Sequence, residues 1–197
     1  MGLGTLLFHL TVNSYIASQS TVCPPFFYTA TRLMLPPASF VDVHLIKEDK
    51  IEHLQSVSVL PPGMDPHNYR GDTLRFHPPT PSHPSPSHLF ATTRGMNSSF
   101  KGYLSVFTIG SDGLLVAEAA ETWETPTSGG KANAIDLIAK DGEGEEGAWI
   151  VLTDDEPSMG GLWILDWDGR RVEVVAGWSG DGGNVDMEGA SHAIWLG

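Results

Sequence analysis

The sequence predicts an all-β fold: a partial β-propeller of about two and a half four-stranded antiparallel blades. From Val41 onward, short apolar runs and period-two alternation are bounded by Gly, Asp and Pro, which is typical of strands and turns. No later stretch has the spacing of a long amphipathic helix. Segments of similar sequence also recur about 60 residues apart, as blades of a propeller do.

The internal repeat is the observation on which the fold class depends. Each similar segment has an apolar stretch with Thr, Gly or Ala at matching places. The aligned pairs are residues 89–93 with 149–153 (149 minus 89, a shift of 60), 102–107 with 161–166 (161 minus 102, a shift of 59), and 133–135 with 192–194 (192 minus 133, a shift of 59). Three aligned pairs in the same order indicate two consecutive copies of one structural unit.

Each unit holds four expected strands, the last two joined by a tight turn. The first unit has strands at 73–76, 89–93, 103–109 and 114–122, with the turn at Ser111-Asp112-Gly113. The second has strands at 132–139, 149–153, 162–167 and 171–178, with the turn at Asp168-Gly169. Before them, residues 41–46 and 51–59 have the pattern of the outer two strands of an earlier unit.

The chain divides into an irregular N-terminal segment, residues 1–38, and the blades, residues 39–197. Segment 1–38 has no clean period and holds four prolines, with at most one short helix or strand near Phe8. A propeller ring closes with about four to eight blades, so the ring is incomplete. Residues 190–196 have the sequence of an inner strand with no blade after it. We expect either a piece of a longer protein or a chain whose open blade edges associate with another copy.

The charge balance limits the partners. The chain has 11 Lys and Arg against 24 Asp and Glu, a net charge of -13, which predicts no binding to nucleic acid or to anionic membrane surfaces. Any anionic substrate therefore needs a locally basic pocket. The single Cys23 excludes an internal disulfide and is compatible with the cytosol. The apolar run within residues 2–16 is too short to span a membrane, and no Lys or Arg precedes Arg32, so we expect a cytoplasmic rather than a secreted protein.

Several short motifs of the chain match a known family. These are Tyr69-Arg70-Gly71-Asp72-Thr73, Thr93-Arg94, Gly102-Tyr103, Pro126-Thr127-Ser128-Gly129-Gly130, Asn133-Ala134, Thr153-Asp154-Asp155 and Ala193-Ile194-Trp195. In order and spacing they resemble the C-terminal half of the fungal 3-carboxy-cis,cis-muconate cyclases, seven-bladed propellers related to propeller-type lactonases. The resemblance covers residues 60–196.

The resemblance implies a cofactor-independent lactonisation in aromatic compound degradation, the β-ketoadipate pathway. In this intramolecular lyase reaction, which is an isomerisation, a substrate carboxylate adds across a neighbouring double bond and an acid protonates the adjacent carbon. A small polycarboxylate substrate requires cationic donors, best supplied by Arg with its bidentate fork. The reaction also requires a positioned proton donor.

The candidate substrate-binding residues are Arg94, Arg70, Lys131 and Asn133. Arg94 ends an expected strand, and the resemblance places its counterpart in the central pocket; a surface ion pair is the alternative. Arg70 lies close to Asp72, which favours a structural Arg-Asp pair over a binding role. Lys131 and Asn133 precede or begin an inner strand and could supply a cation and an amide, or only cap a loop.

His192 is the candidate catalytic residue. It lies on the expected inner strand near the C-terminus, where members of the family more usually carry Asn. A titratable imidazole there could transfer a proton, while a hydrogen-bonded core histidine is the simpler interpretation. The family's own acid and base residues lie largely in its N-terminal half.

Two further clusters of polar residues are expected to be structural and not catalytic or metal-binding. The acidic run Asp154-Asp155-Glu156 at a strand end could bind a cation or hold a raised pKa, but we expect solvated turn residues. Residues 77–88 carry three of the chain's histidines among prolines, which favours an extended exposed loop. We therefore predict no metal site and no cofactor.

Three functions remain open at the level of the sequence. The first is a carboxymuconate cyclase, which an incomplete ring could leave inactive. The second is a sugar-lactone hydrolase of the 6-phosphogluconolactonase-like propeller type, since one fold supports several reactions. The third is a noncatalytic propeller fragment that binds a partner protein or its own copy through exposed blade edges.

Overall fold

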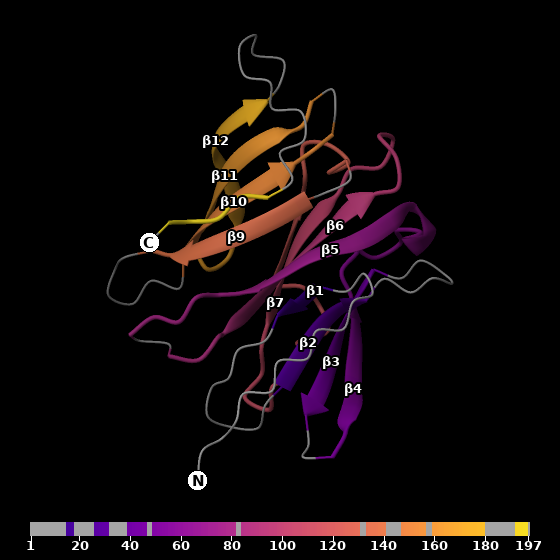
Figure 1. Ribbon diagram of the computed structural model, residues 1–197, viewed down its shortest axis with the longest axis vertical. Coiled ribbons are helices and arrows are strands. Elements are labelled where there is room, and N and C mark those ends of the chain that lie inside the picture. The colour runs from indigo at the N-terminus through magenta and orange to yellow at the C-terminus, as the bar shows by residue number, and fades with distance from the viewer. Residues whose placement is uncertain are drawn as a thin grey trace.

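The chain forms three four-stranded antiparallel sheets in the computed structural model (Figure 1). The structure describes residues 15–17, 26–31, 39–46, 49–81, 84–130, 133–140, 147–156, 159–179 and 192–196. Its one described helix is the short 3-10 turn η1 (Pro66–Asn68). None of the described helical structure is long and apolar enough to cross a membrane.

Each sheet takes four strands in chain order. The first sheet holds β1 (Tyr15–Ala17), β2 (Phe26–Thr31), β3 (Phe40–Ile46) and β4 (Ile51–Ser58). The second holds β5 (Tyr69–Phe76), β6 (His88–Gly95), β7 (Tyr103–Thr108) and β8 (Glu121–Glu124). The third holds β9 (Asn133–Ala139), β10 (Ala148–Asp154), β11 (Gly161–Trp167) and β12 (Val172–Ser179).

The sheets are arranged as successive blades. β1 lies next to β5, and β5 next to β9, so the first strands of the three sheets meet along one line, as the inner strands of a propeller do. The predicted all-β, partial propeller fold is therefore confirmed. The number of blades differs: β1 and β2 fall in the segment predicted to be irregular, but β1 pairs with β2 and β2 with β3, which completes a third sheet.

β8 is shorter and begins later than the sequence predicts. Residues around Leu115 contact the preceding sheet instead. The Gln55 side-chain amide donates a hydrogen bond to Leu115 O at 2.8 Å. The Leu115 N–H donates back to Gln55 Oε1 at 2.9 Å. Because Leu115 forms these bonds to β4 and only an isolated bridge to Ile109, the outer strand of the second sheet starts at Glu121.

Apolar side chains join the sheets in two layers. Between the first and second sheets lie Val41, Val43, Val57, Val59, Leu74, Leu89, Ala91, Phe107 and Leu115. Between the second and third lie Phe90, Leu104, Val106, Ile135, Leu137, Ala148, Ile150, Leu152, Leu165, Trp167 and Val172. Each blade of the chain is thus held to the next by burial of apolar surface.

The repeat alignment is one residue out of register. Leu89 and Ala91 face the preceding sheet, and the residues that do so in the third sheet are Ile150 and Leu152. The sequence alignment paired Leu89 with Trp149 instead. In a strand a slip of one residue moves every side chain to the opposite face, so the repeat identifies the strands correctly but assigns their faces wrongly.

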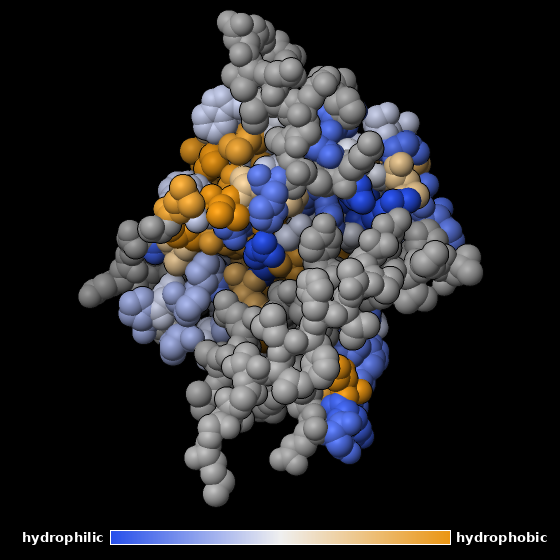
Figure 2. Space-filling model, viewed as in Figure 1, coloured by the Kyte–Doolittle hydropathy of each residue, from blue (hydrophilic) through white to orange (hydrophobic). Residues whose placement is uncertain are grey.

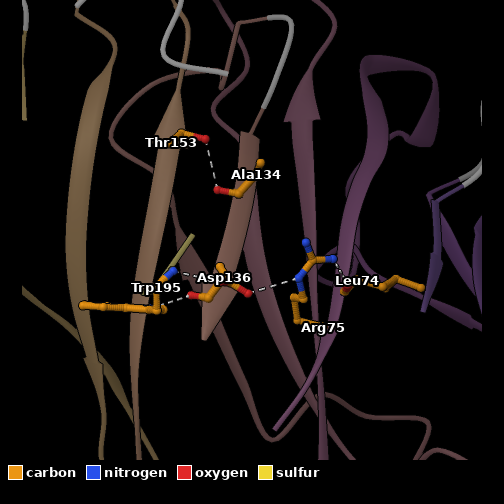
Figure 3. Close-up of polar contacts among 6 residues, drawn as sticks. All are labelled: Leu74, Arg75, Ala134, Asp136, Thr153 and Trp195. Atoms are coloured by element: carbon orange, nitrogen blue, oxygen red, sulfur yellow. Dashed lines mark hydrogen bonds and ion pairs between the residues drawn. The ribbon is translucent and has the colours of Figure 1, made fainter. Parts of the chain in front are cut away.

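The C-terminal residues 192–196 lie beside β9 without forming a regular strand there (Figure 3). The Trp195 N–H donates to Asp136 Oδ2 at 3.1 Å, and its indole N–H donates to Asp136 O at 3.3 Å. Asp136 also pairs with Arg75 of β5, at 3.4 Å. The expected inner strand is therefore wrong for residues 192–196, where Trp195 contacts the innermost strand β9 but no strand forms.

The histidines at the two ends of residues 77–88 are buried, which corrects the expectation of an exposed loop for these two positions, whereas Pro79, Pro81, Pro84 and Ser85 between them are exposed. His77 is 2% exposed and His88 8%. Both rings contact Trp167 of the third sheet edge to face, with centroids 5.5 and 4.7 Å away. Their apolar partner explains the burial, because the segment begins and ends on strands β5 and β6 at the junction of two sheets.

The third sheet carries the most apolar part of the surface seen in Figure 2. Its exposed large apolar side chains, with those of the C-terminal residues, are Ile138, Val174, Val175, Trp178, Ile194 and Leu196.

Candidate functional site

Arg94 is the centre of the candidate site. It lies near the end of β6, at the junction of the second and third sheets, and its side chain is half-buried. Its Nη1 donates to Gly130 O at 3.2 Å, while its Nε is buried and has no hydrogen-bond partner among the described residues. A buried N–H group without a partner costs free energy, and a carboxylate oxygen of a ligand would satisfy it.

Arg70 lies directly across from Arg94 in the sheet, as the paired residue of β5. Its Nε donates to Met96 Sδ at 2.8 Å. Directly opposite residues of an antiparallel pair share a face, and like charges there destabilise the sheet. An anion between the two guanidinium groups would relieve that repulsion.

Asp72 adds a buried carboxyl group beside the two cations. The register of β5 with β6 shifts between Gly71 and Leu74, so Asp72 lies in a bulge. Its Oδ2 accepts a hydrogen bond from the Asn133 N–H of the neighbouring sheet. Burial raises the pKa of Asp72; the Asn133 N–H and the Arg94 charge oppose that shift, and Asp155 adds to it.

Asn133 begins β9 and is fully buried. Its Nδ2 donates to Thr93 O at 2.9 Å, which fixes the amide, and within the described part of the chain no group donates to its buried Oδ1. The Thr92 hydroxyl donates to Asn133 O at 2.7 Å. Asn133 therefore joins the two sheets and also presents an acceptor near Arg94. Lys131 lies outside the described residues.

Two glycines bring the loop before β9 close to these side chains. Gly129 and Gly130 have φ of 80° and 55°, the left-handed region that L side chains rarely adopt. A Cβ at Gly129 would lie 2.7 Å from Asn133 Cβ and 3.1 Å from Arg94 Cβ. A Cβ at Gly130 would lie 2.3 Å from Asp155 Oδ1. The loop can therefore pass between Arg94, Asn133 and Asp155 only because it has no side chains there.

Asp154 is a second buried carboxyl group, which corrects the expected solvated turn. It is 0% exposed at the end of β10, whereas Asp155 and Glu156 are half-buried. Thr127 donates its hydroxyl hydrogen to Asp154 Oδ2, and the Glu156 N–H donates to Oδ1 at 3.0 Å. Burial raises the pKa of Asp154, against the effect of these two hydrogen bonds. Its place between loop and strand indicates a structural carboxyl group.

His192 is exposed and lies three residues before Trp195 in the C-terminal segment. None of the described contacts joins it to Arg94 or Asn133, so its catalytic role stays a prediction. The structure brings together Arg94, Arg70 and Asn133 of the expected residues. It adds Asp72, which the sequence suggested only as a partner for Arg70. The signal for Asp72 was its place in the Tyr-Arg-Gly-Asp-Thr motif.

The cluster can bind an anion and hold a proton. The two guanidinium groups suit a planar carboxylate, the Asn133 Oδ1 can accept a hydrogen bond from a ligand hydroxyl or protonated carboxyl group, and a carboxyl group with a raised pKa can act as an acid. Within the described residues, no group of three or more His, Cys, Asp or Glu side chains could hold a metal ion.

Comparison with known proteins gives a sequence relative and a structural neighbour. No profile of a known family matches the chain. Over 141 residues, 70% of its length, the chain is 31% identical to muconate cycloisomerase 1 of Cutaneotrichosporon cutaneum, and it spans about a third (35%) of that protein.

The structural neighbour is a protein of Bacteroides fragilis, provisionally named a 6-phosphogluconolactonase. The superposition has a TM-score of 0.52 at 11% identity and covers 78% of this chain and 36% of that one. At that identity the similarity concerns the fold alone. The chain is thus similar in sequence to a muconate cycloisomerase and in fold to a lactonase-like protein.

Proposed function

We propose that this chain is part of a lactone-forming enzyme, a 3-carboxy-cis,cis-muconate cyclase of the kind that the motifs resemble. The observation that carries the proposal is the buried, unpartnered Nε of Arg94 beside the cross-strand Arg70. The sequence similarity to a muconate cycloisomerase supports the same reaction class.

The roles of the residues follow from their chemistry. Arg94 and Arg70 bind one substrate carboxylate and fix the orientation of the diene. The attacking carboxylate oxygen forms a C–O bond to one alkene carbon, the π bond breaks, and the adjacent carbon takes a proton. No redox step or cofactor is needed, because the reaction is an isomerisation.

Turnover tests this proposal. The muconate chromophore absorbs in the ultraviolet and is lost when the lactone forms, so the purified chain should reduce that absorbance with 3-carboxy-cis,cis-muconate. Arg94→Ala should reduce the rate at subsaturating substrate, whereas Arg171→Ala, which removes an exposed arginine on the turn before β12, should not. A folded chain that leaves the absorbance unchanged would contradict cyclase activity of this polypeptide.

A sugar-lactone hydrolase is the second candidate, favoured by the structural neighbour. The same two arginines would then bind the phosphate of a phosphorylated gluconolactone. Hydrolysis of that lactone, with no change in the muconate, would select this function. Inactivity toward both substrates by a folded chain would favour a noncatalytic fragment.

A further inference from the structure

The bulge in β5 turns one carboxyl group toward the site. A bulge interrupts strand pairing and redirects a side chain, and bulges are common next to active sites. Here the unpaired residues are Asp72 and Thr73, and the Thr73 N–H donates to Thr92 Oγ1 at 3.0 Å instead of to a strand carbonyl. Asp72 consequently points across the sheet junction to the start of β9, where its Oδ2 meets the Asn133 N–H.

Asp72 is isolated from water, but the charge of Arg94 acts on it. It is 5% exposed, and the charged groups that face it from packed elements are Arg94 of β6 and Asp155 after β10. Arg70 belongs to its own strand, two residues earlier. The bond from Asn133 engages Oδ2, so Oδ1 is the oxygen left to carry a proton toward a ligand held by Arg94.

The charge of Arg94 couples Asp72 to the ligand. In the free protein this charge favours the ionised form of Asp72 and opposes the effect of burial on its pKa. A carboxylate bound to Arg94 offsets the positive charge and adds a negative one nearby. Binding should therefore raise the pKa of Asp72 further and draw a proton onto it.

We propose that Asp72 is the proton donor of the lactonisation. As the substrate carboxylate forms its C–O bond and the π bond breaks, the electron pair on the adjacent carbon takes the proton from Asp72 Oδ1. Asp72 becomes a carboxylate and regains its proton from water after the lactone leaves. The inference rests on the proposed function and adds to it the acid that the reaction needs.

Asp72→Asn is the direct test, because its side-chain oxygen can still accept the Asn133 N–H. Loss of a general acid lowers kcat by about 100- to 10,000-fold while KM changes little. Asp112→Asn is the matched control, since Asp112 is exposed on the turn between β7 and β8 and only caps it. Asp72→Asn that folds and keeps the kcat of the unchanged chain would overturn the proposal.

Two measurements decide the inference even if the chain does not turn over muconate. Carbon-13 NMR of the Asp72 carboxyl group should show a pKa above its ordinary value, and addition of tricarballylate, an unreactive tricarboxylate, should raise it further. Calorimetry of tricarballylate binding in buffers of different ionisation enthalpy should show proton uptake that Asp72→Asn reduces. An Asp72 that titrates at its ordinary value, unaffected by bound tricarballylate, would exclude it as the donor.

The outcomes separate the two proposals. If tricarballylate raises the pKa of Asp72 but the chain does not turn over muconate, the result would refute cyclase activity of this chain and not the proton uptake by Asp72. Turnover that survives Asp72→Asn would refute only the role of Asp72.

Discussion

At the residue scale, the site contains buried polar groups, and burial shifts the pKa of its carboxyl groups. Asp72 lies where β5 meets β9, Asp154 lies between the end of β10 and the loop before β9, and the pKa of each is raised mainly by burial. Arg94 and Asn133 each carry a buried polar atom without a partner. Such groups cost stability, and their accumulation at one end of a sheet junction is typical of a binding site.

The raised pKa of Asp154 predicts how the free energy of unfolding depends on pH. Its pKa is above the ordinary 3.8 in the folded chain, so the folded state binds the proton more tightly than the unfolded state. The free energy of unfolding should therefore fall as pH rises from about 4 through the raised value. Asp154→Asn should reduce this slope, while Thr127 can still donate to the amide oxygen. Denaturant titrations of both chains at several pH values measure how the free energy of unfolding depends on pH.

Asp168 provides a control of opposite sign. The N–H groups of Arg171 and Arg170 both donate to its Oδ1, at 2.8 Å, and lower its pKa. The contribution of Asp168 to the free energy of unfolding should be present above its ordinary pKa and be lost as pH falls. If Asp154→Asn and Asp168→Asn changed the slope in the same direction, the assignment of the two carboxyl groups would be wrong.

Sequence reasoning found the cations of the site and missed the carboxyl group. Arg94 and Arg70 were identified because an anionic substrate needs them, and the motifs flag both. The position of Asp72 depends on a bulge, which no periodicity in the sequence reveals. The burial of Asp154 depends on a loop from another part of the chain, so the run Asp154-Asp155-Glu156 resembled a solvated turn.

At the element scale, the loop before β9 sets the geometry of the site. Gly130→Ala should destabilise the chain and weaken ligand binding, because the new Cβ would meet Asp155 Oδ1 and the Glu156 N at 2.6 Å. Gly63→Ala is the matched control: Gly63 also has a positive φ, 87°, but no atom lies within 4 Å of the new Cβ. Thermal melts and tricarballylate titrations of both variants measure the effects.

Both glycine variants should lose stability to backbone strain of about 1 kcal/mol. Only Gly130→Ala should also lose affinity. Unchanged tricarballylate binding by Gly130→Ala would show that the loop does not shape the site.

The strands were predictable because short apolar runs are bounded by Gly, Asp and Pro. From β3 to β12 every expected strand overlaps an observed one, and the glycines of the two predicted turns, Gly113 and Gly169, have positive φ. β1 and β2 were missed, because their segment has no alternating period. The predicted start of β8 was wrong because Leu115 bonds to Gln55 of β4. These residues are 60 positions apart, so the local sequence pattern does not reveal the contact.

At the scale of the whole molecule, the site lies between sheets and not within one. Arg94 comes from the second sheet, and Asn133 and Asp155 from the third, so the apolar layer between these two sheets holds them in place. The chain spans about a third of its muconate cycloisomerase relative. The activity of that relative is therefore a proposal for this chain, whereas the arrangement of Arg94, Arg70, Asp72 and Asn133 is a property of the described residues.

Binding of an unreactive tricarboxylate tests the central claim most directly. Tricarballylate titrated calorimetrically into the chain should bind, and Arg94→Ala should weaken it by about 10- to 100-fold, the value of a charge-assisted hydrogen bond. Arg171→Ala should bind as the unchanged chain does. Equal affinity of the unchanged chain and a folded Arg94→Ala variant would contradict an anion site at Arg94.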